Sequence, residues 1–449
     1  MAQDQTPEGV FSFLDTDLYK LTMQCAVLKY FPSVKVEYKF TNRTPQMRLN
    51  KTAFNWLKTQ IEKLGNIRLT QQELEFLRSS CPFLRDDYLN YLQFFRLRPA
   101  EQIKLTFQPV DEEFGDLDVV ITGLWVETIL YEIPILALTS EAYFRFVETD
   151  WDHQGQEEKA YQKGVRLLQG GCLVSEFGSR RRRDFHTQDL VVQGLVRSSK
   201  EKDLPGKLTG TSNVYFAMKH RIAPVGTVAH EWFMGIAALT GDYENANLKG
   251  LHYWLECYGA GVLGIALTDT FGTSDFFKAF NKPIPTTTSA SGELISDHVE
   301  SSDGSKGSTF AEVFTGIRQD SGDPKDYVKQ ASEFYDSVGI KGKTIVFSDA
   351  LDVEKCLEYK QVAESYGFKA SFGVGTFFTN DFTLKSDGQT KSKPLNIVIK
   401  LSEAGGKPAI KISDNIGKNT GHAETVEEVK KRLGYTEKQW GDGNEAQRW

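Results

Sequence analysis

Residues 313–376 read VFTGIRQDSGDPKDYVKQASEFYDSVGIKGKTIVFSDALDVEKCLEYKQVAESYGFKASFGVGT, and this stretch decides the fold. Three short apolar runs (313–317, 344–347 and 370–372) alternate with two helical segments (324–338 and 353–366). Asp323 and Pro324 suit the N-cap and the first position of the first helix, and Gly367 suits the end of the second. This alternation predicts an α/β fold with a parallel sheet.

The same pattern begins near residue 170, where short apolar runs again end in small or functional polar groups. These runs are 172–175, 208–210, 225–229 and 262–267. Because active groups converge at the carboxyl ends of barrel strands, polar groups at seven strand ends favour an α/β barrel. The alternative is an open doubly wound sheet, which concentrates its chemistry at one switch point.

The rest of the chain gives weaker signals. The first ~110 residues mix helix and strand patterns, with helices expected at 14–30, 54–64, 71–78 and 85–95 and strands at 34–40, 104–110 and 117–121. Residues 283–310 are rich in Ser, Thr and Gly and predict a mobile surface insertion. Thr425–Glu428 resembles a capping box before a helix that ends at Gly434.

Composition limits the classes of function. The chain has 449 residues, 40% hydrophobic and 25% charged, with 53 basic and 60 acidic side chains and a net charge of −7. These values fit an ordinary globular protein of two or three domains, or one large α/β domain with a satellite. They exclude a disordered, collagen-like or disulfide-stapled chain, and the acidity disfavours a nucleic-acid binder.

Cysteine usage and the N-terminus bear on localisation. The five cysteines are widely spaced without a CxxC pair, so reduced thiols in a cytosolic protein are expected. The start of the chain lacks the features of a secretory signal, and no apolar stretch reaches the ~18 residues of a membrane span. We therefore predict a cytoplasmic protein without membrane contact, and leave a nuclear location open.

Two loops at predicted strand ends carry groups that suit anionic or sugar ligands. In Arg318–Asp323 the arginine offers a planar fork for a carboxylate or phosphate, and the carboxylates suit sugar hydroxyls or hydrated Mg²⁺. Part of this loop can instead serve as a helix cap. Gly373–Thr376 offers backbone N–H groups and a hydroxyl to an anion, although a tight turn is the commoner origin of such a sequence.

His230 is the candidate nucleophile or base, because it follows a predicted strand. A satisfied structural histidine is the alternative at about even odds. Asp269, at another strand end, would accept the second ring N–H and orient the imidazole. Arg180–Arg183 is the strongest basic run: its plain interpretation is a solvated helix start, and its functional one is a clamp for a polyphosphate.

These segments together resemble the nicotinate phosphoribosyltransferase family, most closely its fungal members. The matching stretches include LDTDLYKLTMQ (14–24), YKFTNRT (38–44), SEFGSRRRRDFHTQDLV (175–191), GTSNVYFA (210–217), PVGTVAHEWFMG (224–235), ALTDTFGTSDF (266–276), GIRQDSGDP (316–324), FSDALDVEK (347–355), FGVGTFFTND (372–381) and IKISDNIGKN (410–419). The resemblance implies the irregular α/β barrel of the type II phosphoribosyltransferases plus an α+β domain built from N- and C-terminal segments. The expected parts are 1–140, a catalytic barrel at 141–384 and a C-terminal segment at 385–449 that completes the first part.

The implied reaction joins nicotinate to 5-phosphoribosyl-1-diphosphate and yields nicotinate mononucleotide and diphosphate, in NAD salvage. ATP as co-substrate and Mg²⁺ are implied with it, without assigned Mg²⁺ ligands. A nicotinamide- or quinolinate-using enzyme of the same fold is the alternative, and a catalytically silent binding or scaffold protein is the alternative from another class.

The resemblance also implies roles for single residues. His230 would be phosphorylated by ATP, with Asp269 as its partner. The substrate-binding positions are Tyr19, Thr227 and Arg318 for nicotinate, Gly375 and Thr376 for phosphate, Asp320 and Asp349 for the ribose hydroxyls, and Arg180 for base and diphosphate. Ser212 stands where nicotinamide enzymes carry an aspartate, which would repel the carboxylate of nicotinate. A homodimer is expected, with Tyr19 contributed by the partner chain.

Overall fold

The computed structural model describes residues 8–285, 287–288, 294–295, 307–414 and 419–435. One of its two large sheets has six strands in the order β6-β5-β12-β11-β10-β7, and every neighbouring pair is parallel. The strands are β5 (Leu173–Glu176), β6 (Lys207–Thr211), β7 (Ile265–Leu267), β10 (Gly316–Gln319), β11 (Thr344–Phe347) and β12 (Lys369–Val374). The predicted α/β class with a parallel sheet is confirmed.

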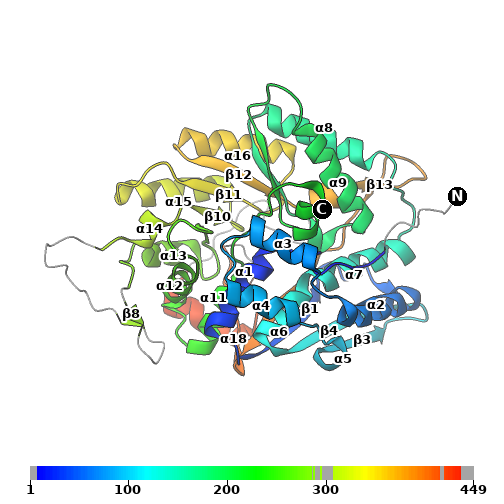
Figure 1. Ribbon diagram of the computed structural model, residues 1–449, viewed down its shortest axis with the longest axis horizontal. Coiled ribbons are helices and arrows are strands. Elements are labelled where there is room, and N and C mark those ends of the chain that lie inside the picture. Colours follow the sequence, from blue (N-terminus) through cyan, green and yellow to red (C-terminus); the bar gives the residue numbers. More distant parts are fainter. Residues whose placement is uncertain (1–7, 286, 289–293, 296–306, 415–418, 436–449) are drawn as a thin grey trace.

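Helices alternate with these strands and cover the outside of the sheet, as Figure 1 shows for α8, α15 and α16. They are α8 (Gln156–Gln169), α9 (Phe185–Ser198), α10 (Val214–His220), α11 (His230–Thr240), α12 (Ala246–Tyr258), α13 (Thr273–Phe280), α14 (Phe310–Val313), α15 (Pro324–Ser337), α16 (Val353–Ser365) and α17 (Thr376–Thr379). The Asp323 side chain caps α15 by accepting from the backbone N–H groups of Lys325 and Asp326, which confirms the predicted helix start.

One predicted strand is wrong. Residues 225–229 form a loop, and an isolated bridge between Thr211 and Pro224 lies just before it. Pro224 has no N–H to donate to a ladder. The loop still lies between the two edge strands, because the Val225 N–H donates to the Thr211 carbonyl (2.9 Å) on β6 and the Thr227 hydroxyl donates to the Ile265 carbonyl (3.2 Å) on β7. The loop therefore links the two edge strands, and together with the six strands it forms the predicted irregular barrel.

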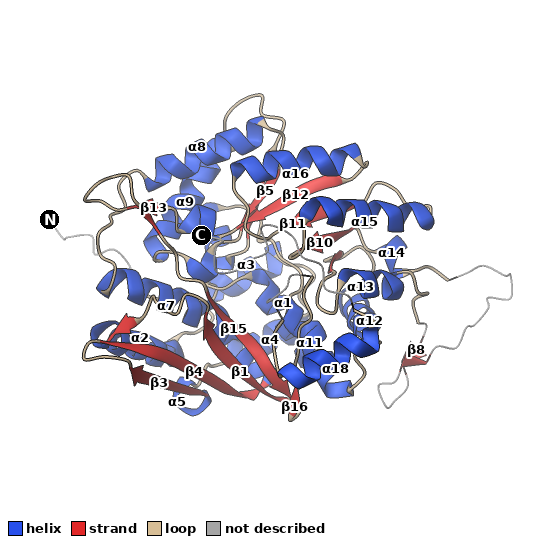
Figure 2. Cartoon of the chain, turned by 180° about the vertical axis from the view of Figure 1, so that it is seen from behind, coloured by secondary structure: helices blue, strands red, loops and turns tan. Residues whose placement is uncertain are grey.

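A second, antiparallel sheet joins strands from both ends of the chain in the order β16-β15-β1-β4-β2, with β3 also paired to β4. Its strands are β1 (Lys35–Asn42), β2 (Leu49–Asn50), β3 (Ile103–Pro109), β4 (Phe114–Leu124), β15 (Ile397–Ala404) and β16 (Lys407–Pro408). Figure 2 shows β15 and β16 beside β1 in this sheet. The register pairs Phe40 with Ile399 and Tyr38 with Leu401, so an early and a late segment form one layer.

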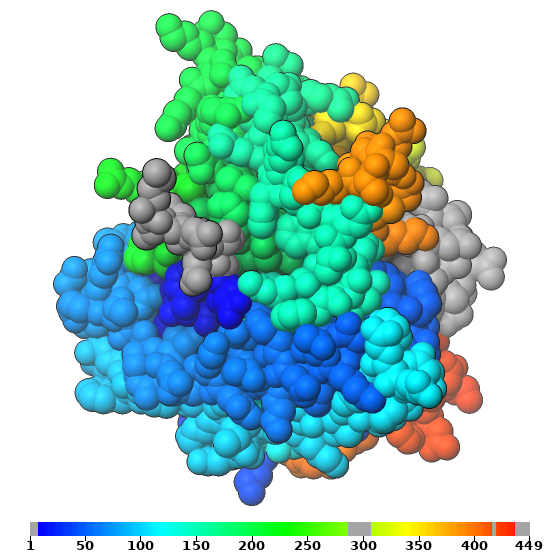
Figure 3. Space-filling view, turned by 90° about the vertical axis from the view of Figure 1, so that its right-hand side faces the viewer, coloured from blue at the N-terminus to red at the C-terminus, as the bar shows by residue number. Residues whose placement is uncertain are grey.

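The described N-terminal part of the chain also holds seven α-helices, α1 (Leu18–Tyr30), α2 (Lys51–Lys63), α3 (Gln71–Ser80), α4 (Asp86–Phe94), α5 (Pro99–Gln102), α6 (Trp125–Thr128) and α7 (Glu132–Phe146). Of these, α2, α5, α6 and α7 pack against strands of the second sheet. Figure 3 shows the N-terminal residues, in blue and cyan, forming one half of this face below the green barrel residues. The hairpin of β13 (Phe382–Thr383) and β14 (Lys391–Ser392), in orange, adjoins the loop at Asp150, whose carbonyl accepts from the Lys385 N–H.

The last described helix, α18 (Ala423–Leu433), begins earlier than predicted. His422 is its N-cap residue and Gly434 ends it in the left-handed conformation, so the predicted capping box at Thr425–Glu428 is wrong although the predicted end is right. Most of the predicted insertion lies outside the described residues. Its two ends are adjacent, because the Ile284 N–H donates to the Ser308 carbonyl.

The segment at residues 409–414 returns to the barrel. Ile412 bridges Phe271, just after β7, and its N–H donates to the Thr270 carbonyl. All five cysteines are free thiols, as predicted. Among the described residues, no helix combines the length and apolar character needed to cross a membrane.

Candidate active site

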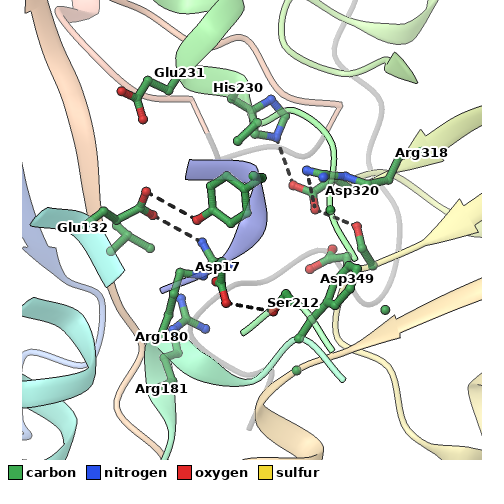
Figure 4. A pocket seen from close by; sticks show the side chains of 18 of the residues that line it. Asp17, Glu132, Arg180, Arg181, Ser212, His230, Glu231, Arg318, Asp320 and Asp349 are labelled. Carbon is green, nitrogen blue, oxygen red and sulfur yellow. Dashed lines mark hydrogen bonds and ion pairs between the residues drawn. The ribbon is translucent and has the colours of Figure 1, made fainter. Parts of the chain in front are cut away.

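A pocket opens at the carboxyl ends of the parallel strands, between the barrel and the second sheet. Ten of the eleven predicted site residues line it: Tyr19, Arg180, Ser212, Thr227, His230, Arg318, Asp320, Asp349, Gly375 and Thr376. Figure 4 shows Asp17, Ser212, His230, Arg318, Asp320 and Asp349 around one cavity. Seven of the ten lie on or shortly after parallel strands, whose carboxyl ends meet at one edge, whereas Tyr19, Thr227 and His230 come from α1, a loop and α11.

His230 is the first residue of α11, at a helix N-terminus rather than at the end of a strand. Its Nδ1 lies 3.0 Å from the Thr270 hydroxyl. Its Nε2 lies 3.0 Å from Asp320 Oδ2 and 2.9 Å from the Lys411 ammonium. Burial and the Lys411 charge lower the pKa of His230 to about 4. The imidazole is therefore neutral at physiological pH.

The predicted pairing of His230 with Asp269 is only partly met. Asp269 Oδ1 lies 3.8 Å from Nε2, which is a charge contact and too long for a hydrogen bond. Asp269 is buried behind the histidine, accepts from the Ser321 hydroxyl (2.5 Å) and lies 3.4 Å from Lys411. The hydrogen-bonded carboxylate is Asp320, which the resemblance assigned to the ribose.

Ser212 has a carboxyl neighbour that sequence reasoning missed. Its hydroxyl donates to Asp17 Oδ1 (2.8 Å), and the Ser179 hydroxyl donates to the same oxygen (2.6 Å). Burial raises the pKa of Asp17 above its usual value, against these two donors and Arg180. Serine at position 212 thus does not keep carboxyl groups away from this part of the pocket. Asp17 lies in the stretch LDTDLYKLTMQ (14–24), which resembles the family, but sequence reasoning gave this residue no role.

Tyr19 reaches the pocket of its own chain, from the first turn of α1. Its hydroxyl lies 3.4 Å from Glu132 Oε2. Next to it, the Lys20 ammonium lies 2.5 Å from both Glu132 and Glu231. Burial works against ionisation of Glu132, but Lys20 and Arg180 lower its pKa below the usual value. This buried network anchors α1 to α7 and α11.

The arginine run divides into two pairs. Arg180 is 47% exposed and lies 3.6 Å from Glu132, and Arg181 also lines the pocket. Arg182 and Arg183 are fully buried, Arg182 in a two-pronged ion pair with Asp15 and Arg183 against the ring of Phe144. A solvated helix start is thus wrong for the second pair, since Asp184 caps α9 after the run.

Arg318 is a candidate anion-binding group of the pocket. Its Nη1 donates to the Val228 carbonyl (3.1 Å) and its Nη2 lies 3.9 Å from Asp320. The side chain is 16% exposed, while its Nε is buried without a hydrogen-bond partner in the described part of the chain. A planar guanidinium suits a carboxylate or a phosphate, so the exposed part of Arg318 can bind an anion.

The remaining cations of the pocket come from segments to which sequence reasoning gave no role. Arg43 follows β1, Lys400 lies on β15 and Lys411 lies on the returning segment. They fall in the stretches YKFTNRT (38–44), PLNIVIK (394–400) and IKISDNIGKN (410–419), which resemble the family, so that resemblance was the available signal. His230, Asp269 and Asp320 have potential metal-ligand atoms within 4.8 Å of one another. The Lys411 ammonium contacts two of these three groups, so the chain supplies its own cation there.

Known proteins share this sequence and architecture. The model of the nicotinate phosphoribosyltransferase family matches residues 172–437, and the model of that family's N-terminal domain matches residues 14–140. A nicotinate phosphoribosyltransferase of Saccharomyces cerevisiae is 46% identical, with 98% of each chain covered, and a probable one of Schizosaccharomyces pombe is 46% identical, with 95% and 98% covered.

Solved structures agree. A crystal structure of a putative nicotinate phosphoribosyltransferase from S. cerevisiae matches with a TM-score of 0.88 and 44% identity, covering 96% of this chain and all of that one. One from Vibrio cholerae matches with a TM-score of 0.80 and 29% identity, covering 96% and 95%.

Proposed function

The chain belongs to the nicotinate phosphoribosyltransferase family and is an enzyme of NAD salvage, and we propose that its pocket joins nicotinate to 5-phosphoribosyl-1-diphosphate with ATP hydrolysis coupled through His230. The observation that carries this proposal is the neutral His230 at the N-terminus of α11, in a pocket that Arg43, Arg180 and Arg318 also line. A nucleophile for a phosphoryl group and clamps for anions thus face the same space.

The transfer itself needs positioning and charge more than acid–base catalysis. Displacing diphosphate from C1 of the ribose builds oxocarbenium-like charge, as in glycoside transfer. The pyridine nitrogen already has a lone pair, so no strong base is required. Arg318 would donate hydrogen bonds to the carboxylate of nicotinate, and the ring would lie near Tyr19 and Thr227.

The sugar phosphate would bind across the strand ends. Asp349 would accept from the ribose hydroxyls, while Asp320 is already engaged by His230 and by the Ser348 hydroxyl (2.9 Å). Gly375 and Thr376, after β12, would donate to the 5′-phosphate. Cations such as Lys400 and Arg180 would stabilise the departing diphosphate.

Mg²⁺ would enter on the phosphates of the substrates, as it does at many phosphoryl sites. We assign no residue of this chain as its ligand. The group of closely spaced donor atoms at His230 already faces the Lys411 ammonium, and a second cation there would be repelled.

The decisive experiment is a turnover assay with nicotinate, 5-phosphoribosyl-1-diphosphate and Mg²⁺, with and without ATP. We expect nicotinate mononucleotide in both cases and faster turnover with ATP. His230→Ala should lose both ³²P labelling by [γ-³²P]ATP and the ATP stimulation, and should keep slow basal transfer. Undiminished labelling of this variant would remove His230 from the role.

The same assay decides between substrates. A panel of nicotinate, nicotinamide and quinolinate tests the alternative of a different pyridine substrate, to which the Asp17 carboxyl beside Ser212 gives some support because it suits an amide donor. Preference for nicotinamide would overturn the proposed substrate. A homodimer and a cytoplasmic location, with a nuclear one left open, remain predictions. Because Tyr19 lines the pocket of its own chain, the pocket does not require a second copy to supply it.

A further inference from the structure

The surroundings of His230 bear directly on its protonation. Its Nε2 has two neighbours with opposite demands: the Lys411 ammonium, 2.9 Å away, can only donate, and the Asp320 carboxylate, 3.0 Å away, can only accept. The Thr270 hydroxyl, 3.0 Å from Nδ1, can donate or accept and so suits either neutral tautomer. Lys411 thus opposes a proton on Nε2, and Asp320 favours one.

The charges around the imidazole balance without a proton on it. Lys411 is paired with Asp269 and Arg318 with Asp320, giving two cations and two anions. If Lys411 were neutral, the imidazole would lie between two carboxylates, at 3.8 and 3.0 Å, with one cation. Opposite charges at such distances favour the imidazolium form, which has no lone pair for a nucleophilic attack.

We propose that Lys411 is a positioning residue that keeps His230 neutral, the form of the imidazole that can act as a nucleophile. This inference rests on the proposed phosphorylation of His230 for its purpose, but its physical content, the protonation state of the ring, is independent of turnover. Lys411 comes from the returning segment at residues 409–414, so the C-terminal part of the chain sets the chemistry of a barrel residue.

In the phosphorylation step the neutral tautomer with its proton on Nδ1 reacts, and its Nε2 lone pair forms a bond to the γ-phosphorus of ATP. The bond between that phosphorus and the bridging oxygen breaks, and its electron pair leaves with ADP. Nδ1 keeps its proton, which the Thr270 hydroxyl oxygen can accept as a hydrogen bond. Lys411 would then face the phosphoryl oxygens, and the N-terminus of α11 adds its partial positive charge.

Other charged groups near the ring do not replace Lys411. Glu231, the next residue of α11, is bound by Lys20, Tyr38 and Trp125. Asp414 follows Lys411 by three residues, and burial and Asp269 raise its pKa to about 6. Its hydrogen bonds come from Thr273, so it acts on the ring only at a distance.

The first test measures the pKa of His230 by NMR on protein with ¹³C-labelled histidine, using the resonance that is absent from His230→Ala. Wild type should titrate near pH 4. Lys411→Met should raise this pKa toward the ordinary value of 6.5, and Lys411→Arg should leave it low. The double variant Lys411→Met/Asp269→Asn restores the charge balance, so its pKa should fall again. This double variant also avoids an unpaired buried carboxylate if the single one fails to fold.

The second test measures the rate of ³²P labelling against pH. A pKa of about 6 would leave only about a quarter of the imidazole neutral at about pH 5.5. The ratio of Lys411→Met to wild type should therefore fall about fourfold between about pH 7.5 and 5.5, and this ratio cancels the protonation of ATP. Lys400→Gln, which removes another pocket ammonium, should leave the shape of the pH profile unchanged.

The outcomes separate the two proposals. Absence of labelling in wild type would overturn the phosphohistidine but not the effect of Lys411 on the pKa of His230. A His230 pKa that stays near 4 in Lys411→Met, or that rises equally in Lys411→Arg, would overturn the role of Lys411. A double variant whose pKa remains as high as that of Lys411→Met would overturn the charge-balance argument as well.

Discussion

Replacing Arg182 by methionine should lower the free energy of unfolding by about 3–5 kcal/mol, the usual cost of removing one partner of a buried ion pair. Both side chains of the Arg182–Asp15 pair are 1% exposed, and two parallel hydrogen bonds of 2.7 Å join them. Methionine has a similar length but no charge, so Asp15 would keep only the amide of Asn213 (2.8 Å) as a donor. The loss is therefore mainly that of an uncompensated buried carboxylate.

Urea unfolding followed by circular dichroism measures this loss. With an m-value of about 3 kcal/mol/M, the midpoint should fall by about 1–2 M. The matched control is Arg197→Met, because Arg197 pairs with Glu157 and Glu158 while 42% exposed. Surface pairs contribute about 0–1 kcal/mol, so this variant should unfold close to wild type.

A second substitution separates charge from packing. Adding Asp15→Leu to Arg182→Met removes the orphaned carboxylate, and we expect most of the lost stability to return. Equal losses for Arg182→Met and Arg197→Met, or a loss below about 1 kcal/mol for Arg182→Met, would refute the argument from burial. No recovery in the double variant would show that packing, and not the unpaired charge, sets the cost.

Two further predictions concern the strand ends. Gly373→Ala would place its Cβ 2.3 Å from the ring of Phe177, a pocket residue, so kcat/KM for nicotinate should fall at least ~10-fold. In Gly375→Ala the Cβ would lie 3.1 Å from the Phe177 carbonyl oxygen, so the loss of kcat/KM should be smaller. Equal losses in the two variants would contradict this reasoning. Burial raises the pKa of Glu176 from 4.5 to about 7, so the folded state holds this proton more tightly than the unfolded chain. Its contribution to the free energy of unfolding is fully present below pH 4.5 and is lost as the pH rises through 7, a loss of roughly 3 kcal/mol. In Glu176→Gln, the free energy of unfolding measured against pH should therefore fall less over this range.

Local signals predicted the barrel elements well because each depends on neighbouring residues. The strand at 344–347 has the predicted bounds, and the helices after Asp323 and Asp352 begin at the predicted caps. The prediction of a strand at 225–229 failed because the apolar run was followed and the Pro224 that precedes it, which lacks an N–H for a ladder, was given no weight. Hydrophobic pattern thus gives the element type but not the pairing.

Long-range partners account for what the sequence could not predict in the site. Burial of Arg182 depends on Asp15, 167 residues away, and the state of His230 depends on Lys411, 181 residues away. A basic run or a lone lysine looks solvated until the fold supplies such a partner. Strand-end residues such as Arg318 were predictable because the topology alone brings them to one edge.

The net charge of −7 and an anionic substrate are compatible because the pocket has its own balance. Six cations line it (Arg43, Arg180, Arg181, Arg318, Lys400 and Lys411) against five acids (Asp17, Glu132, Glu231, Asp320 and Asp349). Two of those acids, Glu132 and Glu231, are bound by Lys20, which leaves the lining more cationic than the count suggests. Since a low-dielectric pocket strengthens each charge contact, a small local excess is enough to hold a diphosphate in a chain that is acidic as a whole.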